Sequence, residues 1–237
     1  MGGQDMGVLV LVHSPLTGPS IWRWVADSLS ARGHQVVVPA VAPPVTSAAA
    51  FADAVAAQLP GLAQEGDRPV LVGHSGAGPV LPLIGARVPA ARLVFVDAHV
   101  PPDGGDAELM PAEYLEPLRA LAVNGMLPRW SEWFGPDTMR ELIPDEARRA
   151  IVSAELPGLP LSYFEARVHI PAGWAGVGGG YVLLSEAYRE AAATAAAHGW
   201  PVERRMGSHL DLVTRPGEIA SAILLAAGSW QLVAGSR

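Results

Sequence analysis

The chain has 237 residues and a formal net charge of -7 at pH 7; half of its residues are hydrophobic and 16% are charged. This length suits one domain with a sizeable core, and the negative charge argues against a nucleic-acid partner, which requires a basic face. Cysteine and lysine are absent, which excludes disulfides, thiolate metal sites, cysteine nucleophiles, Schiff bases on lysine and a lysine-containing phosphate loop.

Aliphatic runs alternate with helical patterns along most of the chain. In chain order they predict a strand over 8–13, a helix over 21–33, a strand over 34–41, a helix over 46–62 capped by Thr46 or Ser47, a strand over 69–75, a helix over 77–88 and a strand over 91–98. Near the end they predict a strand over 180–186, a helix over 187–199, a weak strand over 201–207 and a closing helix over 217–230. Aliphatic strands separated by helices are typical of a parallel sheet covered on both faces, so we expect an α/β fold.

Residues 100–179 interrupt this alternation. The segment has helix-forming clusters and no strand pattern, and its bulky apolar residues include Met126, Trp130, Trp133, Phe134 and Met139. A segment of this length between two sheet strands predicts an inserted helical cap, within a single domain that spans 1–237. The glycine-rich stretch 176–180 is expected to be a flexible return from the cap to the sheet.

Signals for targeting, metals and cofactors are absent from the sequence. No window approaches the roughly 18 uninterrupted apolar residues of a membrane-spanning helix, and no basic residue precedes the first apolar run, so we expect a cytoplasmic protein without a membrane partner. No His-Glu-x-x-His spacing indicates a metal site. The glycines at 176–180 precede a strand instead of opening a helix, which is the wrong context for a dinucleotide. We therefore expect neither a metal nor a cofactor.

The stretch Gly-His-Ser-Gly-Ala-Gly at 73–78 carries the strongest chemical signal. It follows an aliphatic strand and precedes a helix, which is the context of a nucleophile elbow. In such a turn Ser75 adopts a strained backbone conformation and projects its hydroxyl above the carboxyl ends of the strands. Ala77 stands where the usual pattern has glycine, a mild change of size. The alternative is an ordinary glycine-rich turn of a parallel α/β protein.

His209 favours the nucleophile. It lies in a turn between the last weak strand and the closing helix, from which an imidazole can reach over the sheet toward Ser75. A histidine so placed takes the hydroxyl proton and later protonates a leaving group. Ser75 and His209 are therefore predicted to form a proton-transfer pair.

Five features of the chain occur together: the elbow, the His-Ser-Pro turn at 13–15, Trp22, the predicted cap and the closing segment 181–216. With these features the chain resembles the α/β-hydrolase superfamily over nearly its whole length. Within the superfamily it looks most like the small, capped esterase and hydroxynitrile-lyase-like branch. The resemblance implies an α/β-hydrolase fold and a triad in the chain order Ser, Asp or Glu, His. Ser75 then matches the nucleophile and His209 the base.

The acid of this triad has two candidates. The family usually places it in the loop after the penultimate strand, where the nearest carboxylate is Glu186, and we prefer Glu186 on this ground. Asp97 is the alternative, because it ends the strand before, a place from which some hydrolases draw their acid. A surface role for Glu186 and a loop-capping role for Asp97 are the structural alternatives.

The resemblance also implies an oxyanion site with one departure. The family uses two backbone N–H groups, one from the residue after the nucleophile, here Gly76, and one from the third position of the first turn. That position is Pro15, which has no N–H, so Leu16 or the Ser14 hydroxyl is left to replace it. Ser14 also matches a hydroxyl residue that touches the substrate in hydroxynitrile lyases; its alternative is a turn cap.

Three functions are compatible with these features. The leading one is a serine hydrolase of the esterase type, which acts on a small to medium apolar carboxylic ester through an acyl-enzyme. The second is a lyase or cyclase in which Ser75 and His209 move a proton, and the third is a binding protein without activity. Trp130 and Trp133 are candidates to line an apolar pocket, with a place in the cap's own core as the alternative. Formation of a homodimer is also compatible with the sequence.

Overall fold

Six parallel strands form the central sheet of the computed structural model, which describes residues 7–59, 61, 68–135 and 137–228. The strand order is β10-β9-β4-β3-β1-β2, and every neighbouring pair is parallel. The strands are β1 (Val8–Val12), β2 (Gln35–Val37), β3 (Val70–His74), β4 (Arg92–Val96), β9 (Gly179–Leu183) and β10 (Val202–Arg204). The predicted α/β class, with a mostly parallel sheet, is confirmed.

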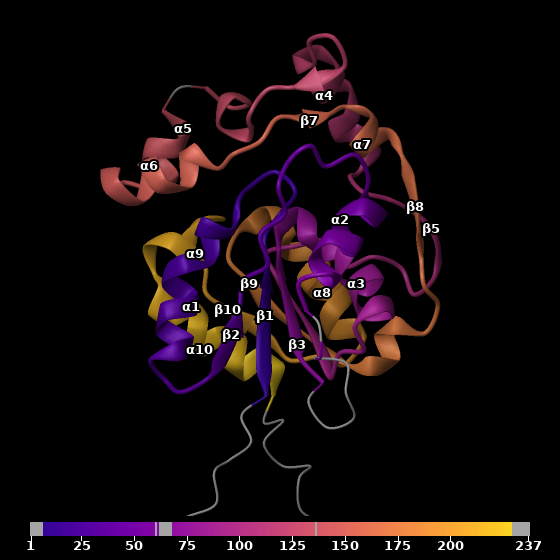
Figure 1. Ribbon diagram of the computed structural model, residues 1–237, viewed down its shortest axis with the longest axis vertical. Coiled ribbons are helices and arrows are strands. Elements are labelled where there is room, and N and C mark those ends of the chain that lie inside the picture. Colours follow the sequence, from indigo (N-terminus) through magenta and orange to yellow (C-terminus); the bar gives the residue numbers. More distant parts are fainter. Residues whose placement is uncertain (1–6, 60, 62–67, 136, 229–237) are drawn as a thin grey trace, which may run out of the picture.

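Helices cover both faces of this sheet (Figure 1). One face carries α1 (Arg23–Ser30) and α10 (Pro216–Ala227), and the other carries α2 (Ala48–Ala56), α3 (Leu81–Arg87) and α8 (Arg189–Ala197). Alternate residues of β1 enter two separate cores, because successive strand side chains point to opposite faces. No helix in the described part of the chain is long and apolar enough to cross a membrane.

The helix boundaries follow local side-chain chemistry. Helix α2 begins after Ser47, whose side chain accepts a hydrogen bond from the N–H of Ala50 at 3.1 Å, so Ser47 is the N-cap. The helix predicted over 77–88 is divided into a 3-10 helix, Ser75–Val80, and α3. Prolines 79 and 82 lack the N–H that a continuous α-helix needs. Residues 60, 62 and 229–230 of two predicted helices lie outside the described residues.

The segment predicted to be a cap, and called the cap below, connects β4 to β9 and lies above the central sheet in Figure 1. Its helices include α4 (Leu115–Leu121), α5 (Thr138–Leu142), α6 (Glu146–Ala154) and α7 (Ser162–Glu165). It also contains two antiparallel strand pairs, β5 (Gly105–Glu108) with β8 (Arg167–Ile170), and β6 (Met126–Leu127) with β7 (Leu159–Pro160). The expectation of a purely helical insertion is corrected here, because strands this short leave no periodic pattern.

The glycines at 176–180 have a packing role. Gly179 and Gly180 belong to β9 and are buried. A Cβ on Gly179 would lie 2.6 Å from the ring of Trp200, and a Cβ on Gly180 would collide with the carbonyl oxygen of Ala226 in α10. These two glycines allow α10 and Trp200 to lie directly against the sheet, which differs from the flexible return expected from the composition.

Candidate active site

Ser75 lies at a sharp turn between β3 and the 3-10 helix that follows. Its φ is +56°, in the left-handed region that a residue with a side chain rarely adopts. The turn is crowded on both sides: a Cβ on Gly73 would lie 2.8 Å from Leu81 Cγ, and a Cβ on Gly78 would collide with the carbonyl oxygen of His99. Glycine at these two positions allows the tight turn, which holds the Ser75 hydroxyl at the carboxyl edge of the sheet.

His209 is hydrogen-bonded to Ser75 and to Asp97. Its Nδ1 lies 2.8 Å from Asp97 Oδ2, and its Nε2 lies 3.0 Å from Ser75 Oγ. Because a carboxylate only accepts, Nδ1 carries the proton, and the lone pair of Nε2 is left to accept the Ser75 proton. The three side chains thus form a continuous line from hydroxyl to carboxylate.

The carboxylate of Asp97 is fully buried and accepts four hydrogen bonds. Oδ1 accepts from the N–H groups of Leu184 and Ser185, each at 2.9 Å, and Oδ2 accepts from the Ser185 hydroxyl at 2.6 Å as well as from His209. Burial acts to raise the pKa of Asp97, but the hydrogen bond and charge of His209 and the donors of Ser185 and Leu184 bring the pKa below its ordinary value. Asp97 therefore remains ionised beside the imidazole.

Ser14 and Gly76 lie against each other on the β1 side of Ser75. A Cβ on Gly76 would be 2.8 Å from Ser14 Oγ. The N–H of Leu16 donates to Ser14 Oγ at 3.2 Å, so this N–H is already engaged. Because Ser14 Oγ acts as the acceptor in this hydrogen bond, its own hydrogen remains available to donate.

The α/β hydrolase family model matches residues 9–222, most of the chain. The chain belongs to the α/β hydrolase family. No curated protein matches its sequence significantly.

Solved structures of similar fold cover nearly all of this α/β hydrolase. An extracellular α/β-hydrolase from a Paenibacillus species, described as a structural and functional homologue of tobacco salicylic acid binding protein 2, is 20% identical, with a TM-score of 0.71 over 93% of this chain and 98% of that chain. A pyrethroid hydrolase from Sphingobium faniae is 18% identical, with a TM-score of 0.70 over 94% and 98%. Tomato methylketone synthase I complexed with 2-tridecanone is 16% identical, with a TM-score of 0.72 over 93% and 97%. At such identities the likeness shows the fold.

Glu186 does not face the imidazole of this α/β hydrolase. Its carboxylate is 65% exposed and forms an ion pair with Arg189 three residues later. The preference for Glu186 as the partner of His209 is therefore corrected to Asp97. The loop after β9, from which the family usually draws its acid, supplies donors here: Leu184 and Ser185 hold the carboxylate that β4 contributes.

Two further rings pack against His209. The ring of His74 lies 4.5 Å away between centroids, and its Nε2 lies 3.0 Å from the carbonyl oxygen of His209, to which it donates. Burial lowers the pKa of His74 to about 3, helped by the charge of His209. His74 is therefore neutral at physiological pH.

The second ring, Tyr188, was not singled out from the sequence. It stacks on His209 with centroids 5.2 Å apart and planes 8° apart. Burial raises the pKa of Tyr188 to about 12, and a hydrogen bond with Ser75 acts in the opposite direction. Tyr188 thus keeps its proton beside the candidate nucleophile. The sequence feature that could have pointed to this residue is an aromatic side chain with a hydroxyl group, two positions after Glu186 in the closing segment.

Trp130 lies beside the imidazole of His209. Its ring centroid lies 6.3 Å from that of His209, so this candidate pocket residue is close to the site. Trp133 instead donates to the carbonyl oxygen of Pro128 and packs on Phe164, within the cap. The cavity over Ser75, which Ser14, Leu16 and Trp130 help to line, has a volume of only about 10 Å³. In this conformation it has room for about one water molecule.

No group of three or more metal-binding side chains occurs within the residues that the structure describes.

Proposed function

We propose that this α/β hydrolase is a serine esterase, which cleaves small to medium apolar carboxylic esters through an acyl-enzyme. The observation that carries the proposal is the hydrogen-bonded line from Ser75 Oγ through His209 to Asp97, with lengths of 3.0 and 2.8 Å. These lengths lie within the reach that a nucleophile, its base and an orienting acid require.

In the proposed reaction Ser75 Oγ attacks the ester carbonyl carbon while His209 Nε2 takes the hydroxyl proton. Asp97 stays ionised, fixes the tautomer of His209 and stabilises the imidazolium that forms. His209 then donates its proton to the leaving alcohol oxygen, and the acyl group remains on Ser75. Water, activated by the same Nε2, hydrolyses the acyl-enzyme and regenerates the serine hydroxyl.

The tetrahedral intermediate needs donors at its oxyanion. Gly76 is the second residue of the 3-10 helix, so its N–H has no partner one turn earlier in that helix. We assign the second donation to the Ser14 hydroxyl, which lies beside Gly76 and whose acceptor capacity is used by Leu16. A side-chain donor is less rigid than a backbone donor, and one such donor contributes about 10²-fold or more to kcat.

A non-hydrolytic lyase or cyclase is the second candidate function. The absence of an N–H at Pro15, with a hydroxyl residue before it, favours this candidate, because it changes the part of the site that is specific to acyl transfer. A methylketone synthase is among the proteins of similar fold. In this alternative the Ser75 and His209 pair would move a proton without forming an acyl-enzyme.

The experiment is turnover of a nitrophenyl ester together with labelling by a fluorophosphonate. We expect a burst of nitrophenol and stoichiometric labelling of the wild type, and Ser75→Ala should lower kcat by about 10⁴-fold or more and abolish labelling. Ser131→Ala, on the cap, is the matched control and should behave like the wild type. A wild type with neither turnover nor labelling contradicts the esterase proposal, and a Ser75→Ala variant that remains active excludes an obligatory acyl-enzyme.

A further inference from the structure

The cavity over Ser75 is too small for the substrate that the proposed function requires. Its volume of about 10 Å³ admits about one water molecule, whereas small-molecule sites have volumes of roughly 300–1,000 Å³. The reacting carbonyl can therefore lie at Ser75 only if the rest of the ester extends into another space.

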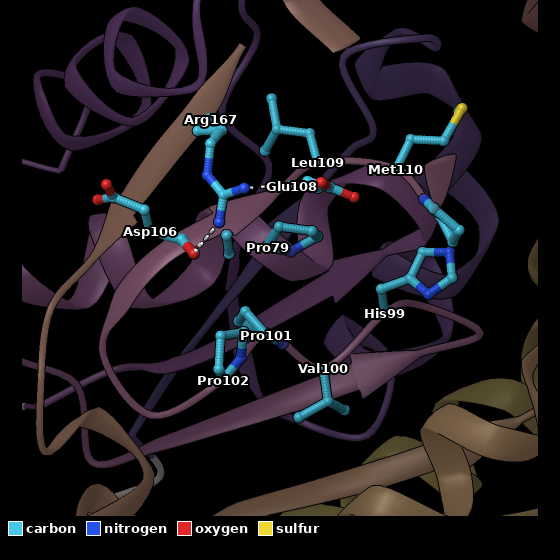
Figure 2. Close-up of a pocket in the computed structure, with 12 residues that line it drawn as sticks. Pro79, His99, Val100, Pro101, Pro102, Asp106, Glu108, Leu109, Met110 and Arg167 are labelled. Carbon is cyan, nitrogen blue, oxygen red and sulfur yellow. Dashed lines mark hydrogen bonds and ion pairs between the residues drawn. The ribbon is translucent and has the colours of Figure 1, made fainter. Parts of the chain in front are cut away.

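A larger pocket lies nearby, where the cap joins the sheet (Figure 2). Its volume is about 330 Å³, within the range of small-molecule sites. We call it the proline pocket; its apolar wall is made by Pro79, Val100, Pro101, Pro102, Leu109 and Met110. Figure 2 shows these side chains around one hollow, with His99 at one edge and the charged Asp106 and Arg167 toward another.

The wall of the proline pocket suits hydrocarbon. Four of its twelve lining residues are prolines, which have no backbone N–H and a fixed φ. The prolines therefore give the pocket one rigid apolar side without backbone N–H donors of their own. A hydrocarbon chain that lies against this side covers few polar groups of the protein, whereas His99, Asp106, Glu108 and Arg167 supply the polar part of the lining.

The charged rim disfavours a ligand with its own carboxylate. Arg167 donates to the carbonyl oxygen of Asp106 at 2.9 Å and lies 3.7 Å from the carboxylate of Glu108. The carboxylates of Asp106 and Glu108 outnumber this single guanidinium among the lining residues. The pocket is thus suited to an uncharged chain and not to a free fatty acid.

Two rings separate the proline pocket from the candidate nucleophile. Pro79 lies in the same 3-10 helix as Ser75, and His99 follows Asp97 by two residues. The ring of His99 lies 5.2 Å from that of Tyr188 between centroids, and Tyr188 in turn stacks on His209. For a chain to extend from Ser75 into the proline pocket, the rings of His99 and Tyr188 must turn aside.

We propose that the proline pocket binds an uncharged hydrocarbon chain of the ester whose carbonyl reacts at Ser75, an inference that rests on the proposed function. His99 and Tyr188 form the wall between this chain and the reacting carbonyl. The chain belongs either to the acyl part or to the alcohol part of the ester. The chemistry of the wall is the same for both.

The test fills the pocket by Val100→Trp and measures selectivity for chain length. Two ratios of kcat/KM are compared: nitrophenyl octanoate to nitrophenyl acetate for the acyl part, and octyl acetate to ethyl acetate for the alcohol part. We expect one of these ratios to fall about tenfold or more, because losing the burial of two methylene groups already has an effect of this size. The ratio that falls identifies the part of the ester held in the pocket.

The matched control is Ala150→Trp, which adds the same ring to a separate cavity of the cap, formed in part by α6. It should leave both ratios unchanged. Met110→Trp fills the proline pocket from its other side and replaces Val100→Trp if that variant does not fold. Two unchanged ratios in a folded pocket variant overturn the proposal.

Binding separates this inference from the proposed function. Methyl octanoate is titrated calorimetrically into Ser75→Ala protein, with and without Val100→Trp, and its affinity should fall about tenfold or more in the double variant. If the wild type hydrolyses no ester, the proposed function fails while this loss of affinity still supports the pocket. Equal affinity in the two proteins overturns the pocket whatever the esterase result.

Discussion

Asp97 is the residue on which the alignment of the proposed triad depends. Its φ of +44° is in the left-handed region, and this bend at the end of β4 directs the carboxylate toward the loop after β9. Three donors from Leu184 and Ser185 hold both oxygens in place before His209 adds the fourth. A carboxylate fixed in this way loses little entropy when it orients the imidazole.

Asp97→Asn should lower kcat for the ester substrate by about 10³-fold or more, with a much smaller effect on KM. The amide can donate to Nδ1, which favours the tautomer that has no lone pair at Nε2 to accept the Ser75 proton. Glu186→Gln should change kcat by less than about twofold, because the exposed ion pair with Arg189 does not contact the imidazole. Steady-state kinetics of both variants, with thermal melting to verify folding, tests this assignment.

A folded Asp97→Asn variant that retains wild-type kcat, or a Glu186→Gln variant with a large loss, would contradict Asp97 as the acid. Because the two carboxylates follow neighbouring strands, the pair of variants also tests the inference that the residue after β4 supplies the acid and the loop after β9 supplies its donors.

Among the contacts between secondary-structure elements, the packing of β9 against α10 most clearly requires a particular residue type, a glycine at position 180. Gly180 lies in β9 where the backbone of α10 approaches most closely, and the carbonyl oxygen of Ala226 occupies the place of a side chain. β9 also pairs with β4 and β10, so displacement of α10 would disturb the strand that precedes the Asp97-binding loop.

Gly180→Ala should lower the free energy of unfolding by about 1–3 kcal/mol, since the added methyl forces a backbone shift in a packed core. Gly176→Ala is the control from the same glycine-rich stretch: nothing lies within 4 Å of its Cβ position, and its φ is not in the left-handed region. It should stay within about 0.5 kcal/mol of the wild type. Urea denaturation measures both, and equal effects would contradict the packing role of Gly180.

On the scale of the whole molecule, buried histidines couple stability to pH. His74 is fully buried and its pKa falls from an ordinary value of 6.5 to about 3, chiefly because burial disfavours the charged ring. Burial also lowers the pKa of His13 and of His99. Between about pH 6.5 and pH 3 the unfolded chain binds a proton at His74 that the folded chain does not, so acid favours unfolding in this window.

The free energy of unfolding should therefore decrease as the pH falls from about 6 to about 4.5, and His74 should contribute about 1.4 kcal/mol per pH unit. His74→Gln keeps a donor for the carbonyl oxygen of His209 and removes the titration. Its slope against pH should be shallower by about that amount, as measured by urea denaturation across the window. The same slope in both proteins would show that His74 does not remain neutral in the folded state.

The sequence by itself determined the architecture and two residues of the candidate site. Aliphatic runs that alternate with helical patterns predicted the parallel sheet. A strand that is buried on both faces has apolar residues at successive positions, without the alternating polar residues of a half-exposed strand. Ser75 was identifiable because a tight strand-to-helix turn requires small neighbours that appear next to it in the chain. His209 was identifiable from its position between the last strand and the last helix.

Only the tertiary structure decided how the rest of the site is arranged. Asp97 and Glu186 follow neighbouring strands. The choice between them depends on which carboxylate contacts His209, and this contact joins segments far apart in sequence. The stacking of Tyr188 on His209, the contact of Ser14 with Gly76 and the proline pocket also join distant segments. Periodicity and turn propensity act over a few residues, so they place elements along the chain, whereas packing between elements fixes which side chains meet.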